Sequence, residues 1–323
     1  MKLGKLFSVS LEKPRLFNFK LTSMIYSFNW IYNGKNLYLI LDYNPPTVAK
    51  VSEKDKELNA TIYSLKNIIT QSEAAEKIEK VLGFNEKIEE FYNKIKDDPL
   101  LKYVPIKLKG ARLRSVDLWT GLVIAVCQQN ASFKQGWRML YNLYKKTGKV
   151  LQVEDHYVIA LPRPKELVKL DARLLAECKL GYRSQTLIEA AKFFLENSLE
   201  EKLPRESPIS AEKILREIKG VGQYSARLTL VLSMRYYELP PIDRWTARIA
   251  QEAYKLPSAT VKTVERVLKE KWGRWAALGV FFLTVVLDAV PLSEALMRLK
   301  ENDLKPSFST EDLTPLNLWS KMT

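Results

Sequence analysis

Residues 210–226 decide the fold and read SAEKILREIKGVGQYSA. The apolar residues before Gly220 recur with a helical period, and a second apolar helix begins at Gln223 and extends to Met234. We expect Ser210 to cap the first helix. The glycine-valine-glycine sequence between the helices lets the backbone turn sharply. The stretch therefore predicts two helices joined by a tight hairpin.

The start of the second helix favours an anionic ligand. The backbone N–H groups of its first turn have no partner within the helix, and the helix dipole adds positive potential at that end. A phosphate suits both features. An ordinary turn between two helices is the alternative that two glycines by themselves leave open. The predicted phosphate-binding residues are Gly220, Val221, Gly222, Gln223 and Ser225.

Charge and residue usage narrow the partner and the chemistry. The 323 residues include 51 Lys and Arg against 37 Asp and Glu, and the net charge of +14 favours a polyanion such as nucleic acid. The cysteines are Cys127 and Cys178 and the single histidine is His156, which excludes a disulfide framework, a four-cysteine iron–sulfur cluster and a tetrahedral Cys/His zinc site. Catalysis then depends on carboxylates, amines, hydroxyls or backbone dipoles.

The patterning divides the chain into three parts. Phe17, Phe19 and Leu21 alternate with polar residues, and Asn33-Gly34 between two apolar runs, at 28–32 and 37–43, predicts a β-hairpin. From about Lys54 the apolar period is that of helices. We expect an N-terminal antiparallel sheet domain with helices over residues 1–90, a helical body over 91–300 with its hairpin at about 210–235, and a C-terminal tail over 301–323.

The apolar residues of the tail, the longest apolar run and the first ten residues predict how the tail packs and where in the cell the protein lies. We expect Leu316 and Trp319 to anchor the tail. The longest apolar run, residues 275–287, is shorter than the about 20 residues that a membrane span needs. Residues 1–10 are too polar for a signal peptide. We expect an intracellular monomer without membrane contact, cytoplasmic and nucleoid-associated if the source is a prokaryote.

Two polar stretches before the hairpin admit more than one interpretation. Basic residues alternate over 107–114 and face either solvent or phosphates. We expect Asp117 to cap the apolar helix at 118–126. After that helix, Gln129 and Asn130 either satisfy helix-end carbonyls or read base edges in a DNA groove.

Asp243 links the hairpin to a known family. It ends the sequence Pro240-Pro241-Ile242-Asp243 and precedes a helix, which it can cap. Together with the hairpin, it resembles the helix-hairpin-helix base-excision DNA glycosylases. Further likeness to that family lies in LGYRS at 180–184, IAQ at 249–251 and WGRW at 272–275. The resemblance covers roughly residues 105–290, and the N-terminal sheet adds a likeness to the 3-methyladenine DNA glycosylase II and 8-oxoguanine DNA glycosylase branches.

The resemblance implies a fold, a partner and a catalytic residue. The fold is α+β, with an N-terminal antiparallel β-sheet packed on a two-lobed, mostly α-helical body and the site for double-stranded, damaged DNA between the lobes. Cleaving an N-glycosidic bond builds positive charge on the sugar. Asp243 as the catalytic carboxylate, about 4 Å away, stabilises that charge by on the order of 4 kcal/mol at an effective dielectric constant near 20. No metal or cofactor is required, although the carbonyls from Ile218 to Val221 can hold a monovalent cation.

The resemblance also implies a subtype. Relatives that cut the strand carry a lysine where this chain has Tyr224, which indicates a monofunctional enzyme. The 8-oxoguanine branch reads its base with a glutamine that residues 277–282 lack, although residues 241–243 and 249–251 resemble that branch more closely. An aromatic pocket suits a positively charged, alkylated base. The alternative for each of these aromatic residues is that it packs in the hydrophobic core and lines no pocket. The expected pocket residues are Tyr224, Trp245, Trp272, Trp275 and Phe281.

The family also fills the gap that a flipped base leaves in the duplex. It does so with a side chain from the loop that Gln129 and Asn130 match. We therefore predict a glycosylase that hydrolytically removes a damaged, alkylated base from duplex DNA without strand cleavage. One alternative is an oxidised-purine glycosylase of the 8-oxoguanine type. The other is a non-catalytic helix-hairpin-helix DNA-binding protein, which has no need for Asp243.

Overall fold

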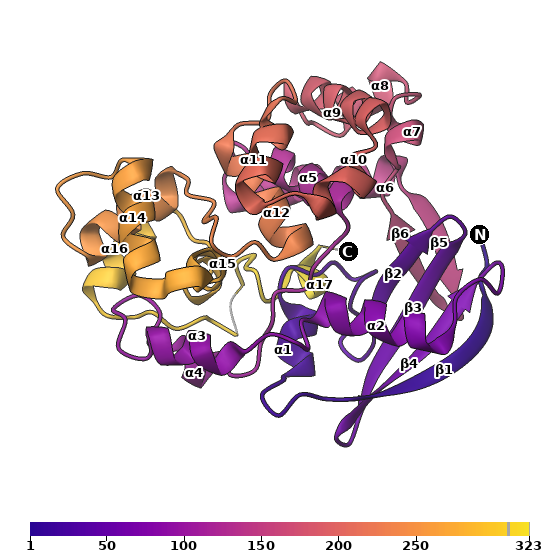
Figure 1. Ribbon diagram of the computed structural model, residues 1–323, viewed down its shortest axis with the longest axis horizontal. Helices are drawn as coiled ribbons and strands as arrows, with labels where there is room; N and C mark the ends of the chain where they lie inside the picture. The colour runs from indigo at the N-terminus through magenta and orange to yellow at the C-terminus, as the bar shows by residue number, and fades with distance from the viewer. Residues whose placement is uncertain (309–310, 323) are drawn as a thin grey trace.

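A four-stranded antiparallel sheet forms the N-terminal part of the computed structural model, which describes residues 1–308 and 311–322 (Figure 1). Its strands run in the order β1-β4-β3-β2, and Ala74, Ile78 and Leu82 of the helix α2 pack on one face. The elements of this part are β1 (Gly4–Glu12), α1 (Phe19–Met24), β2 (Leu37–Tyr43), β3 (Pro46–Lys54), β4 (Glu57–Ser64) and α2 (Gln71–Leu82).

Two predictions for this part are wrong. The alternation at Phe17, Phe19 and Leu21 does not form a strand, because Asn18 caps the helix α1 by accepting from the Leu21 N–H at 2.9 Å. The helical period expected from about Lys54 begins only at α2, because β4 precedes it and lies between β1 and β3 in the sheet. Its buried residues, Leu58, Ala60 and Ile62, follow the period of two that a strand requires.

The hairpin predicted around Asn33 is only partly present. The Asn33 side chain makes the turn by accepting from two backbone N–H groups, at 3.1 and 2.8 Å. Residues 28–32 are not a strand, and their pairing with the start of β2 is limited to an isolated bridge between Tyr32 and Leu37 and a hydrogen bond from the Tyr38 N–H to the Ile31 carbonyl. Phe28 and Trp30 stack at 4.5 Å and are buried in the core of the first helical lobe. Burial of these two rings outweighs pairing along the strand.

The first helical lobe follows the sheet and has its own core. Asp117 caps its first helix as predicted, accepting from the Thr120 N–H at 3.0 Å. A short β-hairpin, which the sequence pattern did not indicate, covers the second face of the N-terminal sheet. The elements are α5 (Leu118–Cys127), α6 (Phe133–Thr147), β5 (Lys149–Val153), β6 (His156–Ala160), α7 (Pro164–Leu167), α8 (Ala172–Glu177), α9 (Arg183–Asn197), α10 (Leu199–Lys202), the 3₁₀ helix η1 (Leu203–Arg205), α11 (Pro208–Arg216) and α12 (Gln223–Met234).

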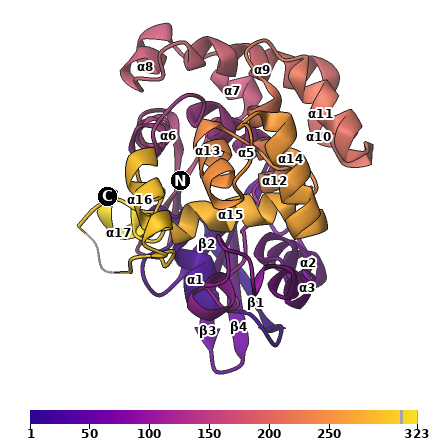
Figure 2. The same ribbon diagram turned by 90° about the vertical axis from the view of Figure 1, so that its left-hand side faces the viewer.

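The second helical lobe combines two segments that flank the first lobe in the sequence, and Figure 2 shows α13 to α16 from the front. Phe91 before the first lobe stacks on Phe282 after it, with ring centroids 5.7 Å apart. Among the described residues, no helix is long and apolar enough to cross a membrane. The elements are α3 (Ile88–Ile95), α4 (Val104–Lys107), α13 (Arg244–Ala253), α14 (Val261–Trp272), the 3₁₀ helix η2 (Gly273–Trp275), α15 (Ala276–Val286) and α16 (Leu292–Lys300).

The basic stretch at 107–114 has a structural role that neither interpretation anticipated. Arg112 is 1% exposed and donates to the Leu16 carbonyl at 2.7 Å. Arg114 donates to the carbonyls of Thr22 and Ile25, both at 2.8 Å. These guanidinium groups therefore hold the segment after β1 against the helical body, whereas Lys107 and Lys109 of the same stretch are exposed to solvent.

The tail returns from the second lobe to the N-terminal part, where it ends in the short helix α17 (Leu318–Lys321) (Figure 1). Leu316 is 1% exposed, and Trp319 packs on Tyr32 with ring centroids 5.2 Å apart. The anchoring predicted for Leu316 and Trp319 is confirmed.

Candidate DNA-binding hairpin and base pocket

The hairpin connects α11 to α12 as expected, with one correction at its start. Ser207, and not Ser210, caps α11 by accepting from the Ser210 N–H at 3.2 Å, because Pro208 occupies the first helical position. Gly220 has a φ of +88°, and a Cβ at this position would lie 2.5 Å from Oγ1 of Thr186. The turn therefore requires glycine for both its conformation and its packing.

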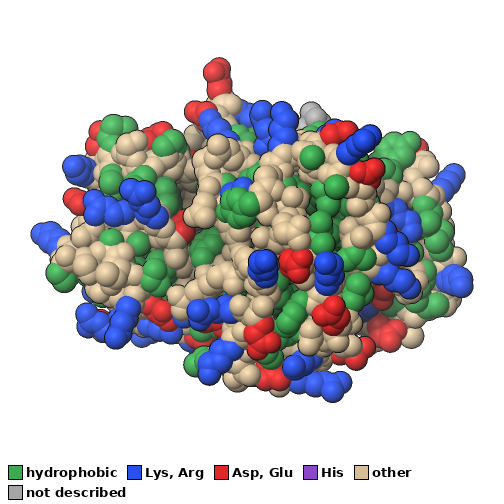
Figure 3. Space-filling view, turned by 90° about the horizontal axis from the view of Figure 1, so that it is seen from above, with side chains coloured by type: hydrophobic (Ala, Val, Ile, Leu, Met, Phe, Trp, Pro, Cys, Tyr) green, Lys and Arg blue, Asp and Glu red, His purple; other side chains and the backbone are tan. Residues whose placement is uncertain are grey.

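Gly222 presents the free end of α12 to solvent. It is exposed, and a Cβ built on it meets nothing within 4 Å. Gly222 is the N-cap of α12 and has no side chain that could accept a hydrogen bond. The N–H groups of the first turn of α12 therefore stay unpaired, and such groups bind anions. Lys and Arg side chains stand out over both helical lobes in the view from above, and they add positive potential (Figure 3).

Val221 and Ser225 take inward positions in the hairpin. Val221 is 5% exposed, and its N–H donates to the Ile218 carbonyl at 2.9 Å. Ser225 is 2% exposed, and its hydroxyl accepts from Gln129 Nε2 at 2.8 Å. The Val221 N–H and the Ser225 hydroxyl are therefore unavailable to a phosphate. Of the predicted set, Gly220, Gly222 and Gln223 remain at the surface.

Gln129 and Asn130 differ sharply in their surroundings. The Gln129 amide is buried and also donates to the Gly220 carbonyl at 2.9 Å, so it supports the hairpin from within. The prediction that Gln129 acts as a duplex wedge is wrong, because its side chain is held inside the protein. Asn130 is exposed with a φ of +43°, and its Nδ2 lies 3.4 Å from the hydroxyl of Tyr182, which is 55% exposed. Tyr182 is a surface aromatic that the predicted site did not include.

The carbonyls predicted to hold a monovalent cation are partly engaged. The Ile218 carbonyl accepts from the Val221 N–H, and the Gly220 carbonyl accepts from Gln129. Each carbonyl oxygen has two lone pairs, so one remains on each for a cation. The cation stays a prediction.

Arg227 connects the hairpin to the loop before Asp243. Its guanidinium is buried and pairs with Glu212 of α11 and Glu265 of α14, both at 2.8 Å. It also donates to the Pro240 carbonyl at 3.3 Å. One buried cation thus joins the hairpin, the second lobe and the loop that carries the carboxylate. An arginine in the middle of an apolar helix was the only sign of this role in the sequence.

Asp243 combines the two roles that its sequence position leaves open. Its Oδ1 caps α13 by accepting from the Thr246 N–H at 2.7 Å. Its Oδ2 accepts no hydrogen bond from any described residue, and the half-buried side chain lines a cavity. A carboxylate held by one oxygen and open at the other can act on a positive charge in that cavity.

The cavity has a volume of about 990 Å³ and reaches both helical lobes. Tyr224, Trp245 and Phe281 line it as predicted. Burial and the Asp243 carboxylate raise the pKa of the Tyr224 phenol. Tyr224 therefore contributes a neutral, protonated group to the cavity that Asp243 also lines.

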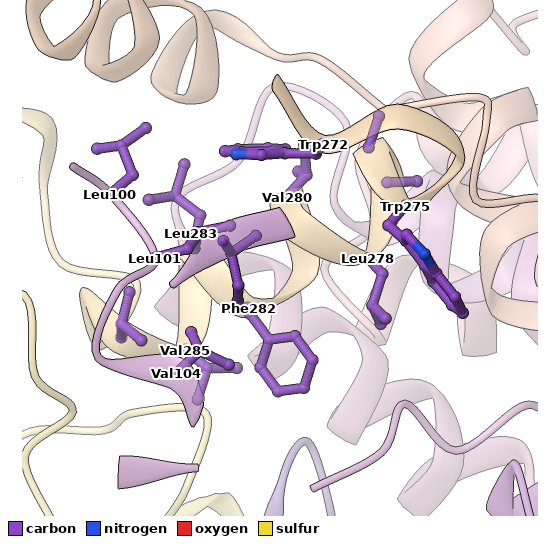
Figure 4. Packing of buried hydrophobic residues seen from close by; sticks show 14 of the residues in the cluster. Leu100, Leu101, Val104, Trp272, Trp275, Leu278, Val280, Phe282, Leu283 and Val285 are labelled. Carbon is purple, nitrogen blue, oxygen red and sulfur yellow. The ribbon is translucent and has the colours of Figure 1, made fainter. Parts of the chain in front are cut away.

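Trp272 and Trp275 do not line the cavity, and their assignment to the pocket is wrong. Figure 4 shows both indoles among the apolar side chains of the second lobe's core. Trp272 is fully buried beneath Gly279 and donates from Nε1 to Asp98 at 2.9 Å. Trp275 packs against Tyr237, with ring centroids 5.8 Å apart. Both rings are therefore part of the hydrophobic core, which is the alternative that the sequence left open for them.

Five other aromatic residues line the cavity and escaped prediction. Tyr26 and Phe28 come from the segment after α1, and Phe133, Trp137 and Tyr144 come from α6. Tyr26 stacks on Trp137 with centroids 5.3 Å apart and planes at 14°. Tyr26 also lies 5.5 Å from Phe281, so rings from the N-terminal part and both lobes meet in one place.

Two helices joined by a glycine hairpin, with a carboxylate at a cavity between two lobes, define a helix-hairpin-helix protein. The HhH-GPD superfamily of base excision DNA repair proteins matches this chain over residues 123–274. This match spans a little under half of the chain, and it agrees with the resemblance to the helix-hairpin-helix base-excision superfamily that the sequence indicates.

Several known proteins resemble the chain. A DNA-3-methyladenine glycosylase of Bacillus subtilis (strain 168) is 25% identical over 206 residues, or 61% of this chain and 66% of that protein, just under two thirds. A 3-methyladenine DNA-glycosylase from Archaeoglobus fulgidus shares 20% identity with a TM-score of 0.70, covering 86% of this chain and 97% of that one. An apo 8-oxoguanine glycosylase/lyase of Clostridium acetobutylicum shares 20% identity with a TM-score of 0.68, covering 88% and 98%. These structures confirm the α+β fold.

Proposed function

We propose that this protein is a DNA glycosylase of base excision repair that removes an alkylated base by hydrolysis and leaves the strand intact. The observation that carries the proposal is the open Oδ2 of Asp243 at an aromatic cavity, in a chain whose Gly222 presents the free end of α12. A non-catalytic DNA-binding protein has no use for that carboxylate. Relatives named for alkylated and for oxidised bases share the fold, so the fold leaves the lesion open.

The reaction assigns a task to each part of the site. The free N–H groups at Gly222 and Gln223 bind a phosphate of duplex DNA, and the damaged nucleotide rotates into the cavity. As the bond to the base breaks, positive charge grows on the sugar, and the Asp243 carboxylate stabilises it. Water then completes the hydrolysis at the sugar carbon, and Asp243 is placed to orient that water through Oδ2.

The lining of the cavity favours alkylated bases over oxidised ones. Aromatic faces attract cations, and alkylation at a ring nitrogen makes a purine electron-poor and positively charged. Tyr26, Trp137, Trp245 and Phe281 supply such faces. An 8-oxoguanine-type activity is the second candidate, because residues 241–243 and 249–251 resemble that branch more closely.

A panel of duplexes tests the proposal directly. Each duplex carries one lesion, and abasic sites and strand nicks are scored separately. We expect abasic sites from alkylated purines. Abasic sites from 8-oxoguanine alone would support the second candidate, and binding without excision of any lesion would support the non-catalytic alternative.

We expect Asn130→Ala to lower the excision rate more on a normally paired lesion than on a mismatched one. A mismatched base is already easy to flip, so it depends less on a residue that fills the gap. The measurement is the single-turnover rate on both duplexes. Gln129→Ala is the matched control, because it removes hydrogen bonds worth about 1–3 kcal/mol from the hairpin and weakens binding to all DNA. Equal losses on both duplexes for Asn130→Ala would contradict the wedge.

We expect borohydride to trap no covalent complex between the wild-type protein and lesion DNA. Tyr224 occupies the position of the amine in strand-cutting relatives, and a phenol forms no imine with the sugar. The abasic product should stay intact until alkali is added. A trapped adduct would refute the monofunctional assignment and indicate another lysine, of which the exposed Lys219 is nearest in sequence.

A further inference from the structure

Tyr26 lines the cavity and is held firmly in place. Its backbone has a φ of +52°, an unusual conformation for a bulky residue. Its N–H donates to the Pro315 carbonyl of the tail at 2.8 Å, and its ring stacks on Trp137. Such a conformation persists only where the surroundings over-determine it. The tail and α6 together therefore fix where the Tyr26 hydroxyl lies.

The direction of the hydrogen bonds at this hydroxyl follows from proton counting. The Tyr26 hydroxyl is hydrogen-bonded to Thr284 Oγ1, and both residues line the cavity. Thr284 Oγ1 also bonds the Phe281 carbonyl at 2.7 Å, and a carbonyl only accepts. The single proton of Thr284 is thus used at Phe281. The proton between the two hydroxyls belongs to Tyr26, so Tyr26 has no proton left for the cavity and only lone pairs.

Two other oxygen-bearing side chains, Tyr224 and Asp243, line the same cavity as Tyr26. Burial, Asp243 and Tyr26 all raise the pKa of Tyr224. Burial raises the pKa of Tyr26 itself, which therefore keeps its proton at neutral pH. The cavity's arginines are engaged elsewhere, since Arg114 donates to backbone carbonyls and Arg298 pairs with Asp288 at 3.0 Å.

We infer that Tyr26 is a specificity-determining residue, whose hydroxyl selects damaged bases that carry an exocyclic amino group over those with a carbonyl at the same place. An amino group donates a proton to the lone pairs of Tyr26, whereas a carbonyl oxygen would meet another acceptor. With C6 of the purine at Tyr26, the substrate class is an alkylated adenine, which has an amino group there, in preference to an alkylated guanine or hypoxanthine, which have a carbonyl there. This inference rests on the proposed glycosylase function.

Two variants change the polarity of this position in different ways. Tyr26→Phe removes the acceptor but keeps the ring. Thr284→Val removes the acceptor for the Tyr26 proton, which then becomes available to a carbonyl on the base. Thr284→Ser is the matched control, because it keeps the hydroxyl that links Tyr26 to Phe281.

The substrate is DNA treated with dimethyl sulfate, which carries 3-methyladenine and 3-methylguanine in one sample. The measured quantity is the ratio of the two released bases in single-turnover reactions, and a ratio cancels differences in active enzyme. We expect wild type to favour 3-methyladenine. Tyr26→Phe should lower the ratio about 3- to 10-fold, the usual effect of one hydrogen bond. Thr284→Val should lower it further, and Thr284→Ser should keep it.

The outcomes separate this inference from the function on which it rests. Release of neither base by wild type would overturn the glycosylase proposal. Release of both bases with the same ratio in wild type, Tyr26→Phe and Thr284→Val would overturn the role of Tyr26 alone. If Tyr26→Phe does not fold, as judged by thermal melting, the comparison of Thr284→Val with Thr284→Ser decides the question.

Discussion

Asp243→Asn should abolish excision while leaving DNA affinity nearly unchanged. The carboxylate acts on charge that exists only as the glycosidic bond breaks, and its loss removes on the order of 4 kcal/mol, about a thousandfold in rate. The fold should tolerate the change, because an asparagine oxygen can still accept from the Thr246 N–H and cap α13. The measurement is the single-turnover rate beside the dissociation constant for the same duplex.

The control for this prediction is Asp243→Ala, which removes both the charge and the cap. It should lose activity as Asp243→Asn does and also lose about 1 kcal/mol of stability in a thermal melt. A rate for Asp243→Asn within threefold of wild type would refute the catalytic role. In that case Asp243 would be only the cap of α13, which the capping hydrogen bond by itself also explains.

Gly222→Glu should weaken binding to damaged and undamaged duplex alike, on the order of 100-fold. The new carboxylate would occupy the open space at the start of α12, where we propose that a phosphate binds. Two like charges about 4 Å apart repel by between about 1 and 4 kcal/mol, depending on how much water lies between them. Phosphate contacts carry no sequence information, so the loss should not depend on the lesion. The measurement is a binding titration at fixed salt.

Gly222→Ala is the matched control for charge. Its Cβ meets nothing within 4 Å, so the fold should be kept and the affinity should fall much less than in Gly222→Glu. Gly220→Ala does not serve as this control, since its φ of +88° and the contact with Thr186 would strain the turn itself. A loss confined to damaged DNA would show that the hairpin does not hold the phosphate.

Local features of the site were predictable from the sequence. The hairpin glycines and the start of α12 at Gln223 lie where the pattern indicates, and Asp117 and Asp243 cap the helices that follow them. Turns and caps depend on groups within a few residues along the chain, so their signal is local. The missing strand at residues 28–32 arose where long-range burial decided the outcome for Phe28 and Trp30. The missing strand at Phe17 to Leu21 instead reflects a local cap, Asn18, that the alternation concealed.

The sequence by itself therefore determined the helix-hairpin-helix motif, the position of the carboxylate and the absence of a lysine at Tyr224. Only the tertiary structure decided which rings face the cavity and which lie in the core. Trp272 and Trp275 proved to be core, whereas Tyr26, from far along the chain, meets the other cavity rings. The physical reason is that an aromatic ring has the same sequence signal whether it packs on other side chains or on an open space. That difference depends on residues brought together by folding.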